Sequence, residues 1–135
     1  MESRIERHFC SSGEIACEIY YYRHQMHRID GPAYTSYYKS AKIEIQVYYI
    51  KDVRHRLDGP AYLRRFESGE IETEEYIVNG IFLKTFEKYY SIKEKIFEYI
   101  QKYPKYIKEV ELLARHNNWL NEKELELLAC MDMFK

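Results

Sequence analysis

The sequence predicts an α+β protein in which a meandering antiparallel repeat β-sheet is followed by a C-terminal helical cap. The octapeptide His-Arg-x-Asp-Gly-Pro-Ala-Tyr occurs at 27–34 and again at 55–62, a spacing of 28 residues. Before each copy the chain alternates in the manner of a strand, whereas its last third has apolar residues at helical spacing. Eight of nine arginines precede Lys84, and nine of twelve lysines lie from Lys84 onward. We therefore divide the chain into a repeat sheet over 1–84 and a helical region over 85–135.

A fixed period of 28 residues predicts stacked units, each burying apolar surface only against its neighbours. We expect about three such units, with strands at 15–22 and 43–50 in the first two. The third unit is decayed: its Gly69-Glu70-Ile71 repeats Gly13-Glu14-Ile15, but Leu83-Lys84 replaces His-Arg and no Asp-Gly-Pro-Ala follows. We expect the repeat array to end with this copy and the helices to follow it.

Alternation within the strands predicts which face is buried. In the first copy Ile15, Cys17, Ile19 and Tyr21 share one face, which we expect to be the buried one. After each strand comes a short polar stretch, and in the third copy this is Asn79-Gly80. Asn-Gly is the strongest short hairpin signal, so all three copies are expected to reverse direction here.

The octapeptide predicts a tight structural corner in each of the first two units. Asp can bond nearby backbone, Gly accepts positive φ, and Pro fixes φ. We interpret the motif as structural, with side chains that satisfy corner backbone and lock the register. The corner residues are His27, Arg28, Asp30, Gly31 and Pro32, and His55, Arg56, Asp58, Gly59 and Pro60.

Two chemical interpretations of the corner compete with the structural one. Zinc bound by His27 and His55 would need further ligands, and the candidates (His8, Cys10, Cys17 and His24) show no recognisable spacing. A protein-kinase catalytic loop is excluded, because its His-Arg-Asp is contiguous and a Gly-rich loop precedes it. We therefore expect no catalytic residue, no metal and no cofactor.

The repeated Tyr-Tyr, short turn and His-Arg-x-Asp-Gly-Pro-Ala resemble the variant MORN-type repeats of large DNA viruses, notably marseilleviruses, and of some phage and bacterial proteins. The resemblance covers residues 11 to about 84, and the third copy departs from it. It implies a viral, intracellular protein (host cytoplasm or nucleus) that binds a host or viral protein rather than catalysing a reaction. It also leaves open peripheral association with anionic lipid.

The C-terminal region predicts three helices. The first is capped by Ser91 and Glu94 and carries a stripe that ends at Pro104. The second runs over about 105–115, and Asn121 with Glu124 caps a third. The expected inward residues are Ile92, Ile96, Tyr99, Ile100 and Tyr103; Tyr106, Ile107, Val110, Leu113 and Ala114; and Leu125, Leu128, Ala129, Met131 and Phe134. We expect these stripes to cover the open end of the sheet; a partner-docking or homodimer surface is the alternative.

Tyrosine and arginine mark a candidate interaction surface. Tyr20 and Tyr48 are equivalent, as are Tyr34 and Tyr62, and each pair is expected to form a ladder; Arg64-Arg65 is the adjacent basic pair of the repeats. Residues 1–83 carry 11 basic and 13 acidic side chains, which argues against nucleic acid and weakens the lipid alternative.

The apolar stretches and the three cysteines indicate the environment of the protein. No apolar stretch approaches the roughly 18 residues of a membrane span, and the N-terminus is charged. Cys10, Cys17 and Cys130 form neither an even set nor a CxxC pair, which predicts free thiols in a reducing compartment and a protein that is not secreted.

Overall fold

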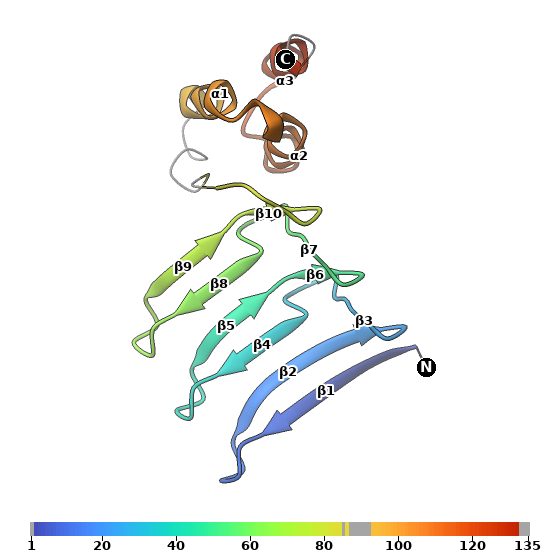
Figure 1. Ribbon diagram of the computed structural model, residues 1–135, viewed down its shortest axis with the longest axis vertical. Helices are drawn as coiled ribbons and strands as arrows, with labels where there is room; N and C mark the ends of the chain where they lie inside the picture. Colours follow the sequence, from blue (N-terminus) through green and yellow to red (C-terminus); the bar gives the residue numbers. More distant parts are fainter. Residues whose placement is uncertain (1, 85, 87–92, 133–135) are drawn as a thin grey trace.

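The computed structural model describes residues 2–84, 86 and 93–132. It confirms the α+β prediction: an antiparallel sheet is followed by C-terminal helices (Figure 1). The long strands are β1 Ser3–Phe9, β2 Ile15–Tyr22, β4 Tyr34–Tyr37, β5 Ile43–Val47, β8 Tyr62–Arg65 and β9 Ile71–Glu75. They pair in the order β1-β2-β4-β5-β8-β9, so each strand lies beside its neighbours in the chain.

Each long hairpin is continued by a short one. The short strands are β3 Gln25–Met26, β6 Tyr49–Ile50, β7 Val53–Arg54, β10 Ile77–Val78 and β11 Ile81–Phe82. Strand β3 pairs with the end of β2, β7 with β6, and β11 with β10. The two central residues of these turns all have positive φ, at 23–24, 51–52 and 79–80. That conformation is the one Asn-Gly favours in a two-residue hairpin, so the predicted reversal in all three copies is confirmed.

The backbone repeats with the period of the sequence. A register shift occurs at Ser36/Tyr37 in β4 and again at Arg64/Arg65 in β8. The same shift occurs at His8/Phe9 in β1. Strand β1 therefore completes a third long hairpin. Strand β1 was not predicted from the sequence, although Gly13-Glu14 repeats Gly69-Glu70, which follows a strand in the last unit.

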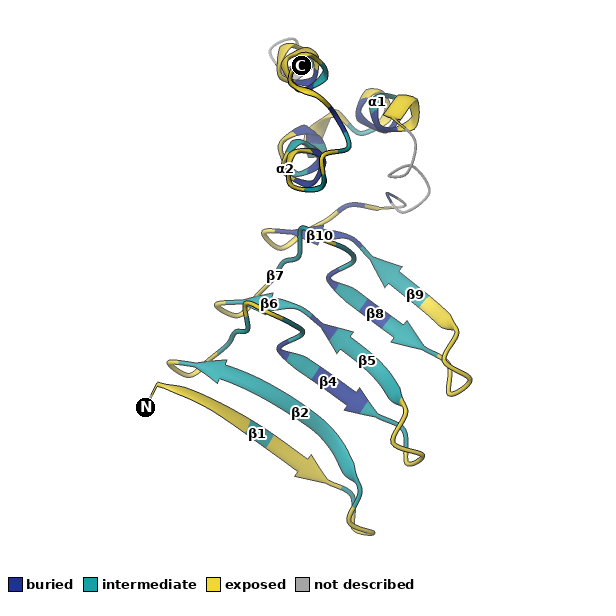
Figure 2. Cartoon of the chain, turned by 180° about the vertical axis from the view of Figure 1, so that it is seen from behind, coloured by how far each residue is buried: buried dark blue, intermediate teal, exposed yellow. Residues whose placement is uncertain are grey.

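The burial prediction for the isoleucine face is wrong. All of β2 is only partly buried, and in β5 only Val47, 3% exposed, is buried on that face (Figure 2). The sheet is a single layer. The described helices lie beyond β10, at the end of the stack of units, and do not cover a face of the sheet (Figure 1). No described element supplies a second layer, so the face that carries the isoleucines stays partly open.

The main hydrophobic core lies between the last unit and the helices. The helices are α1 Lys93–Lys102, the 3-10 turn η2 Pro104–Tyr106, α2 Ile107–Asn117 and α3 Glu122–Asp132. Their buried stripes meet Tyr76, Val78 and Leu83 of the last unit and Phe86 beyond it. The helices thus cover the short-hairpin end of the last unit, while β9 remains the last strand in the order of the sheet.

The structure confirms one predicted helix cap and corrects one inward residue. Asn121 and Glu124 form the expected reciprocal cap, with each side chain accepting from the other residue's backbone N–H at 2.9 and 2.8 Å. Helix α2 ends where Asn118 adopts left-handed φ of 57°. Ala129 is exposed, so its inward assignment is wrong. Ser91, Ile92 and Phe134 lie outside the described residues.

Candidate interaction surface

Each octapeptide forms a corner in which arginine is the central side chain. We call residues 27–32 the first corner and 55–60 the second corner. The guanidinium of Arg28 lies 4.0 Å from the ring centroid of Tyr20, and that of Arg56 lies 4.0 Å from Tyr48. Both side chains are largely buried, so stacking on tyrosine replaces part of their hydration. Tyr20 and Tyr48 thus serve as platforms for arginine, rather than for the tyrosine ladder predicted between them.

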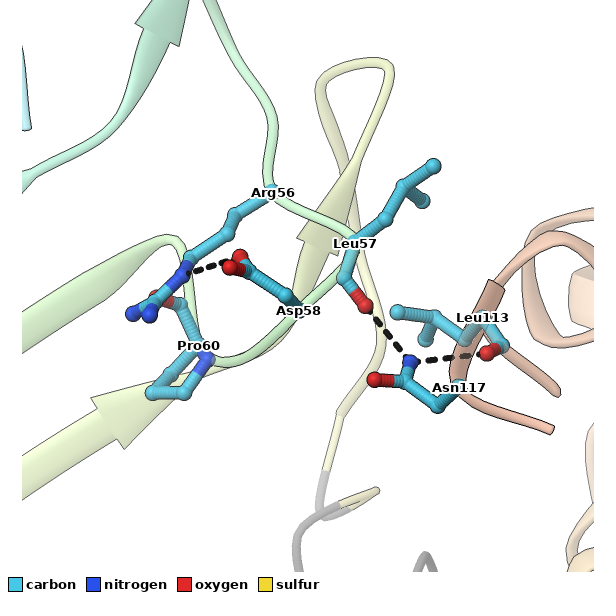
Figure 3. Close-up of polar contacts among 6 residues, drawn as sticks. All are labelled: Arg56, Leu57, Asp58, Pro60, Leu113 and Asn117. Atoms are coloured by element: carbon cyan, nitrogen blue, oxygen red, sulfur yellow. Dashed lines mark hydrogen bonds and ion pairs between the residues drawn. The ribbon is translucent and has the colours of Figure 1, made fainter. Parts of the chain in front are cut away.

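The remaining arginine contacts close the corner. Arg28 donates from Nε to Asp30 at 3.1 Å and from Nη1 to the carbonyl of Pro32 at 3.3 Å. Arg56 makes the same bonds to Asp58 at 2.7 Å and Pro60 at 3.1 Å (Figure 3). The Arg56 guanidinium lowers the pKa of Asp58, mainly through its hydrogen bond. The two octapeptides therefore hold their backbone by equivalent contacts.

The predicted positive φ of Gly31 and Gly59 is wrong. Among the described glycines, only Gly13, Gly69 and Gly80 have it. The corner glycines are needed for a different reason: a Cβ at either position would lie 2.8 Å from the Cζ of Arg28 or Arg56. Glycine lets the guanidinium pack directly on the backbone.

Replacing Gly31 or Gly59 by Val is expected to lower the free energy of unfolding by more than about 1 kcal/mol, because the added carbons displace the arginine from its tyrosine and from its carbonyl acceptor. Denaturant unfolding of both variants measures this. Gly13→Ala is the control for backbone effects: at a φ of 102° the alanine is strained, but nothing lies within 4 Å, so this variant should lose stability without displacing an arginine. Unchanged stability in both corner variants would contradict the arginine packing.

The corner histidines connect one unit to the next. His27 Nδ1 accepts from the backbone N–H of Lys51 at 3.1 Å, and His55 Nδ1 accepts from that of Asn79 at 2.9 Å. These N–H donors lie in the short-hairpin turn of the following unit. The arrangement agrees with a structural role, and within the described ranges no group of three or more His, Cys, Asp or Glu side chains could hold a metal ion.

We expect His27→Ala and His55→Ala to destabilise the protein similarly, by about 1 kcal/mol each, since each removes one equivalent hydrogen bond. Burial lowers the pKa of His55 below its ordinary value of 6.5. The imidazole of His55 therefore binds a proton more readily in the unfolded chain than in the folded one. Its contribution to the free energy of unfolding is fully present above about pH 6.5 and is lost as the pH falls from there through the pKa of the folded state.

Unfolding free energies at pH 7.5 and 5.5 test this expectation. The acidic residues with a lowered pKa, Glu14, Asp58 and Glu124, titrate from ordinary values of 4.5 or below and stay ionised throughout. His55→Ala should reduce the loss of stability at pH 5.5. An identical loss in wild type and variant would contradict the role of its neutral ring.

Tyr34 and Tyr62 lie in one row across the sheet. Both pair with Val47, from opposite sides, and Tyr34 also pairs with Ile19. Directly paired residues point to the same face, so we call Ile19, Tyr34, Val47 and Tyr62 the tyrosine row. The ladder predicted between the two tyrosines is thus interrupted by Val47. Arg54 borders the row, with its guanidinium 5.6 Å from the Tyr62 ring centroid.

The adjacent basic residues Arg64 and Arg65 both bind groups of the same chain. Arg64 forms ion pairs with Glu44 at 3.3 Å and Glu72 at 3.5 Å. Arg65 donates to the carbonyl of Gly69 at 3.1 Å in its own hairpin turn. Two acidic neighbours offset the charge of Arg64, so this pair adds little to any attraction for anionic lipid.

The second corner also receives the end of α2, a contact that the sequence analysis missed. The side-chain nitrogen Nδ2 of Asn117 donates to the carbonyls of Leu57 at 2.6 Å and Leu113 at 2.8 Å (Figure 3). The Leu57 side chain packs against the helical core. From the sequence, the second helix was expected to end at about residue 115, and no contact was predicted for Asn117.

Two open depressions adjoin the first corner. One, of about 980 Å³, lies on the β1 side of the corner and includes Ile5, Tyr20, Tyr22 and Ile29. The other, of about 400 Å³, lies between the corners and reaches His116 of α2. Both are lined in part by the first corner, with Arg28, Ile29 and Asp30 among their residues.

Comparison with models of known protein families, with curated proteins and with solved structures gives no match. Within the described residues, no helix is both long enough and apolar enough to cross a bilayer.

Proposed function

We propose that this chain is a non-enzymatic protein-interaction module, viral in origin and of the MORN type, which binds a host or viral protein through its repeat sheet and helical tail. The observation that carries the proposal is the tyrosine row on a single-layer sheet. Tyr34 and Tyr62 are partly exposed, and the helices lie beyond the sheet rather than over this row (Figure 2).

The chemistry of this surface suits a protein partner. Tyrosine and arginine are enriched at the energetic centres of protein interfaces, where a rigid ring gives apolar contact and its hydroxyl remains free to bond. Arg54 supplies the arginine beside Tyr62. Burial raises the pKa of Tyr34 above its ordinary value of 10.0, so its hydroxyl stays protonated and able to donate near neutral pH.

Membrane association through anionic lipid is the second candidate. It is favoured only by the resemblance to MORN-type repeats, and the net acidic repeat region together with the paired Arg64 opposes it. We rank it below protein binding.

Quantitative affinity capture from expressing cells tests the proposal. The tagged chain is compared with the double variant Tyr34→Thr/Tyr62→Thr, because threonine suits a strand but removes both rings. The control is Phe66→Ser, which removes an exposed ring away from the row and outside the helical tail. Wild type and control should recover the same protein, and the row variant should lose it at least tenfold while keeping a cooperative melt.

Undiminished recovery by the row variant would contradict the proposal. Flotation of the wild-type chain with vesicles of one-third phosphatidylserine provides the second arm. The chain should remain unbound, and salt-sensitive flotation would favour the lipid alternative.

A further inference from the structure

The second corner is bound within the molecule by the end of a helix. Asn117, in the last turn of α2, donates to the backbone carbonyl of Leu57, and the Leu57 side chain packs against the helical core (Figure 3). His116 and Asp58 line the same depression, which places a basic group of the helix end near the corner carboxylate. The contact thus combines an apolar side chain, a side-chain amide and a basic residue.

The first corner presents the same features, and in the part of the chain that the structure describes no helix residue is hydrogen-bonded to it. Its backbone is held by the same arginine bonds and by the equivalent bond from the N–H of Arg28 to the carbonyl of Tyr49, as Arg56 bonds to Ile77. Ile29 stands where the second corner has Leu57, yet it is 86% exposed, the highest exposure among the large apolar side chains that the structure describes. The Asp30 side chain is also 86% exposed.

We propose that the first corner is a docking site for the C-terminal turn of a helix from a partner protein. The helix packs its apolar stripe on Ile29, donates a side-chain amide to the Ile29 carbonyl, and places a basic residue near Asp30. This inference rests on the proposed protein-binding function and names the chemistry of one partner segment. The occupant is a helix that resembles the end of α2, since the second corner shows what this backbone accepts.

The end of such a helix would enter the depression between the corners, which has a volume of about 400 Å³ and is lined by Ile29, Asp30 and, from α2, His116. Successive units are two strands apart, roughly 10 Å at the usual strand separation. Packed helices have axes roughly 8–10 Å apart. These two spacings are similar, so a partner helix whose end enters this depression would lie close to α2, which borders it through His116.

A peptide with the sequence of residues 104–120, stapled on its solvent face, is the probe, because an unconstrained helix of this length is only marginally stable in water. It is titrated into the full-length ¹⁵N-labelled chain, whose own α2 occupies the second corner. We expect saturable amide shifts centred on residues 27–32. Ile29→Ser in the protein and Asn117→Ala in the peptide should each weaken binding at least fivefold.

Ile29→Ser should leave the melting midpoint unchanged, because the side chain is exposed, so lost binding reports the site rather than the fold. Phe66→Ser, which removes an exposed ring from a hairpin turn, should bind the peptide as wild type does. Absence of shifts at millimolar peptide, equal affinity of Ile29→Ser, or shifts centred on the second corner would each overturn the site.

The two experiments distinguish a failure of the docking site from a failure of the proposed function. If the peptide does not bind but the tyrosine-row variant still loses its captured protein, the docking site is wrong and the proposed function stands. If the row variant keeps its captured protein, the proposed function is wrong.

Discussion

A fragment that ends at residue 84 should aggregate or fail to melt cooperatively. Among the described residues, 14 buried side chains form the core that joins the last unit to the helices, and of these Tyr76, Val78 and Leu83 precede the cut. Removing the helices exposes these three side chains on a unit that has no successor, and exposed apolar ends of a repeat array recruit other chains. Size-exclusion chromatography and thermal melting of the fragment measure the effect.

Ile71 is already 46% exposed with the helices present, so its exposure is not part of this effect, whereas Ile77 is 4% exposed. A control fragment of the same length, in which Val78 and Leu83 are changed to Ser, should regain solubility. A soluble, monomeric, cooperatively melting 1–84 fragment without these changes would show that the helices are a docking tail rather than a cap.

Replacing Tyr99 by Ala should cost about 3–5 kcal/mol of unfolding free energy, the usual range for removing a large buried aromatic side chain. Tyr99 is fully buried in α1, with ring centroids of Phe86 and Tyr103 at 5.1 and 4.8 Å. Its hydroxyl also donates to the carbonyl of Lys84 at 3.0 Å. Denaturant unfolding followed by circular dichroism gives the value.

Two further variants separate the parts of this contact. Tyr99→Phe keeps the ring and should cost only about 1 kcal/mol, since it removes one hydrogen bond. Leu127→Ala, at a residue of α3 that is 57% exposed, should change stability by less than about 0.5 kcal/mol. Equal effects of Tyr99→Ala and Leu127→Ala would contradict the position of the core.

Periodic features of the fold could be predicted from the sequence. The alternating segments and the Asn79-Gly80 turn identify strands and reversals, because their signals are local, and the same holds for the Asn121 and Glu124 cap. The role of Gly31 could not be predicted. It depends on where the Arg28 side chain folds back, which is a tertiary contact and not a backbone preference.

The residues of the candidate site could be predicted from the sequence, but their arrangement could be predicted only in part. Tyr34 and Tyr62 are equivalent by the repeat, but the strand register places Val47 between them. The contact of Asn117 with Leu57 joins positions 60 residues apart, and no short-range pattern signals it. Burial of the isoleucine face was overestimated because alternation shows which residues share a face, and does not show whether another layer covers it.

The equivalence of the two corners is the claim on which the repeat fold and the docking site depend, and the Nε–H groups of Arg28 and Arg56 report on it directly. In ¹H–¹⁵N spectra of the full-length chain, both groups should be protected from exchange, and the Cδ protons of both arginines should be shifted upfield by the rings of Tyr20 and Tyr48. Tyr20→Leu should remove the shift for Arg28 alone, and Tyr48→Leu for Arg56 alone. Protection and ring shifts at only one arginine would show that the two octapeptides fold differently.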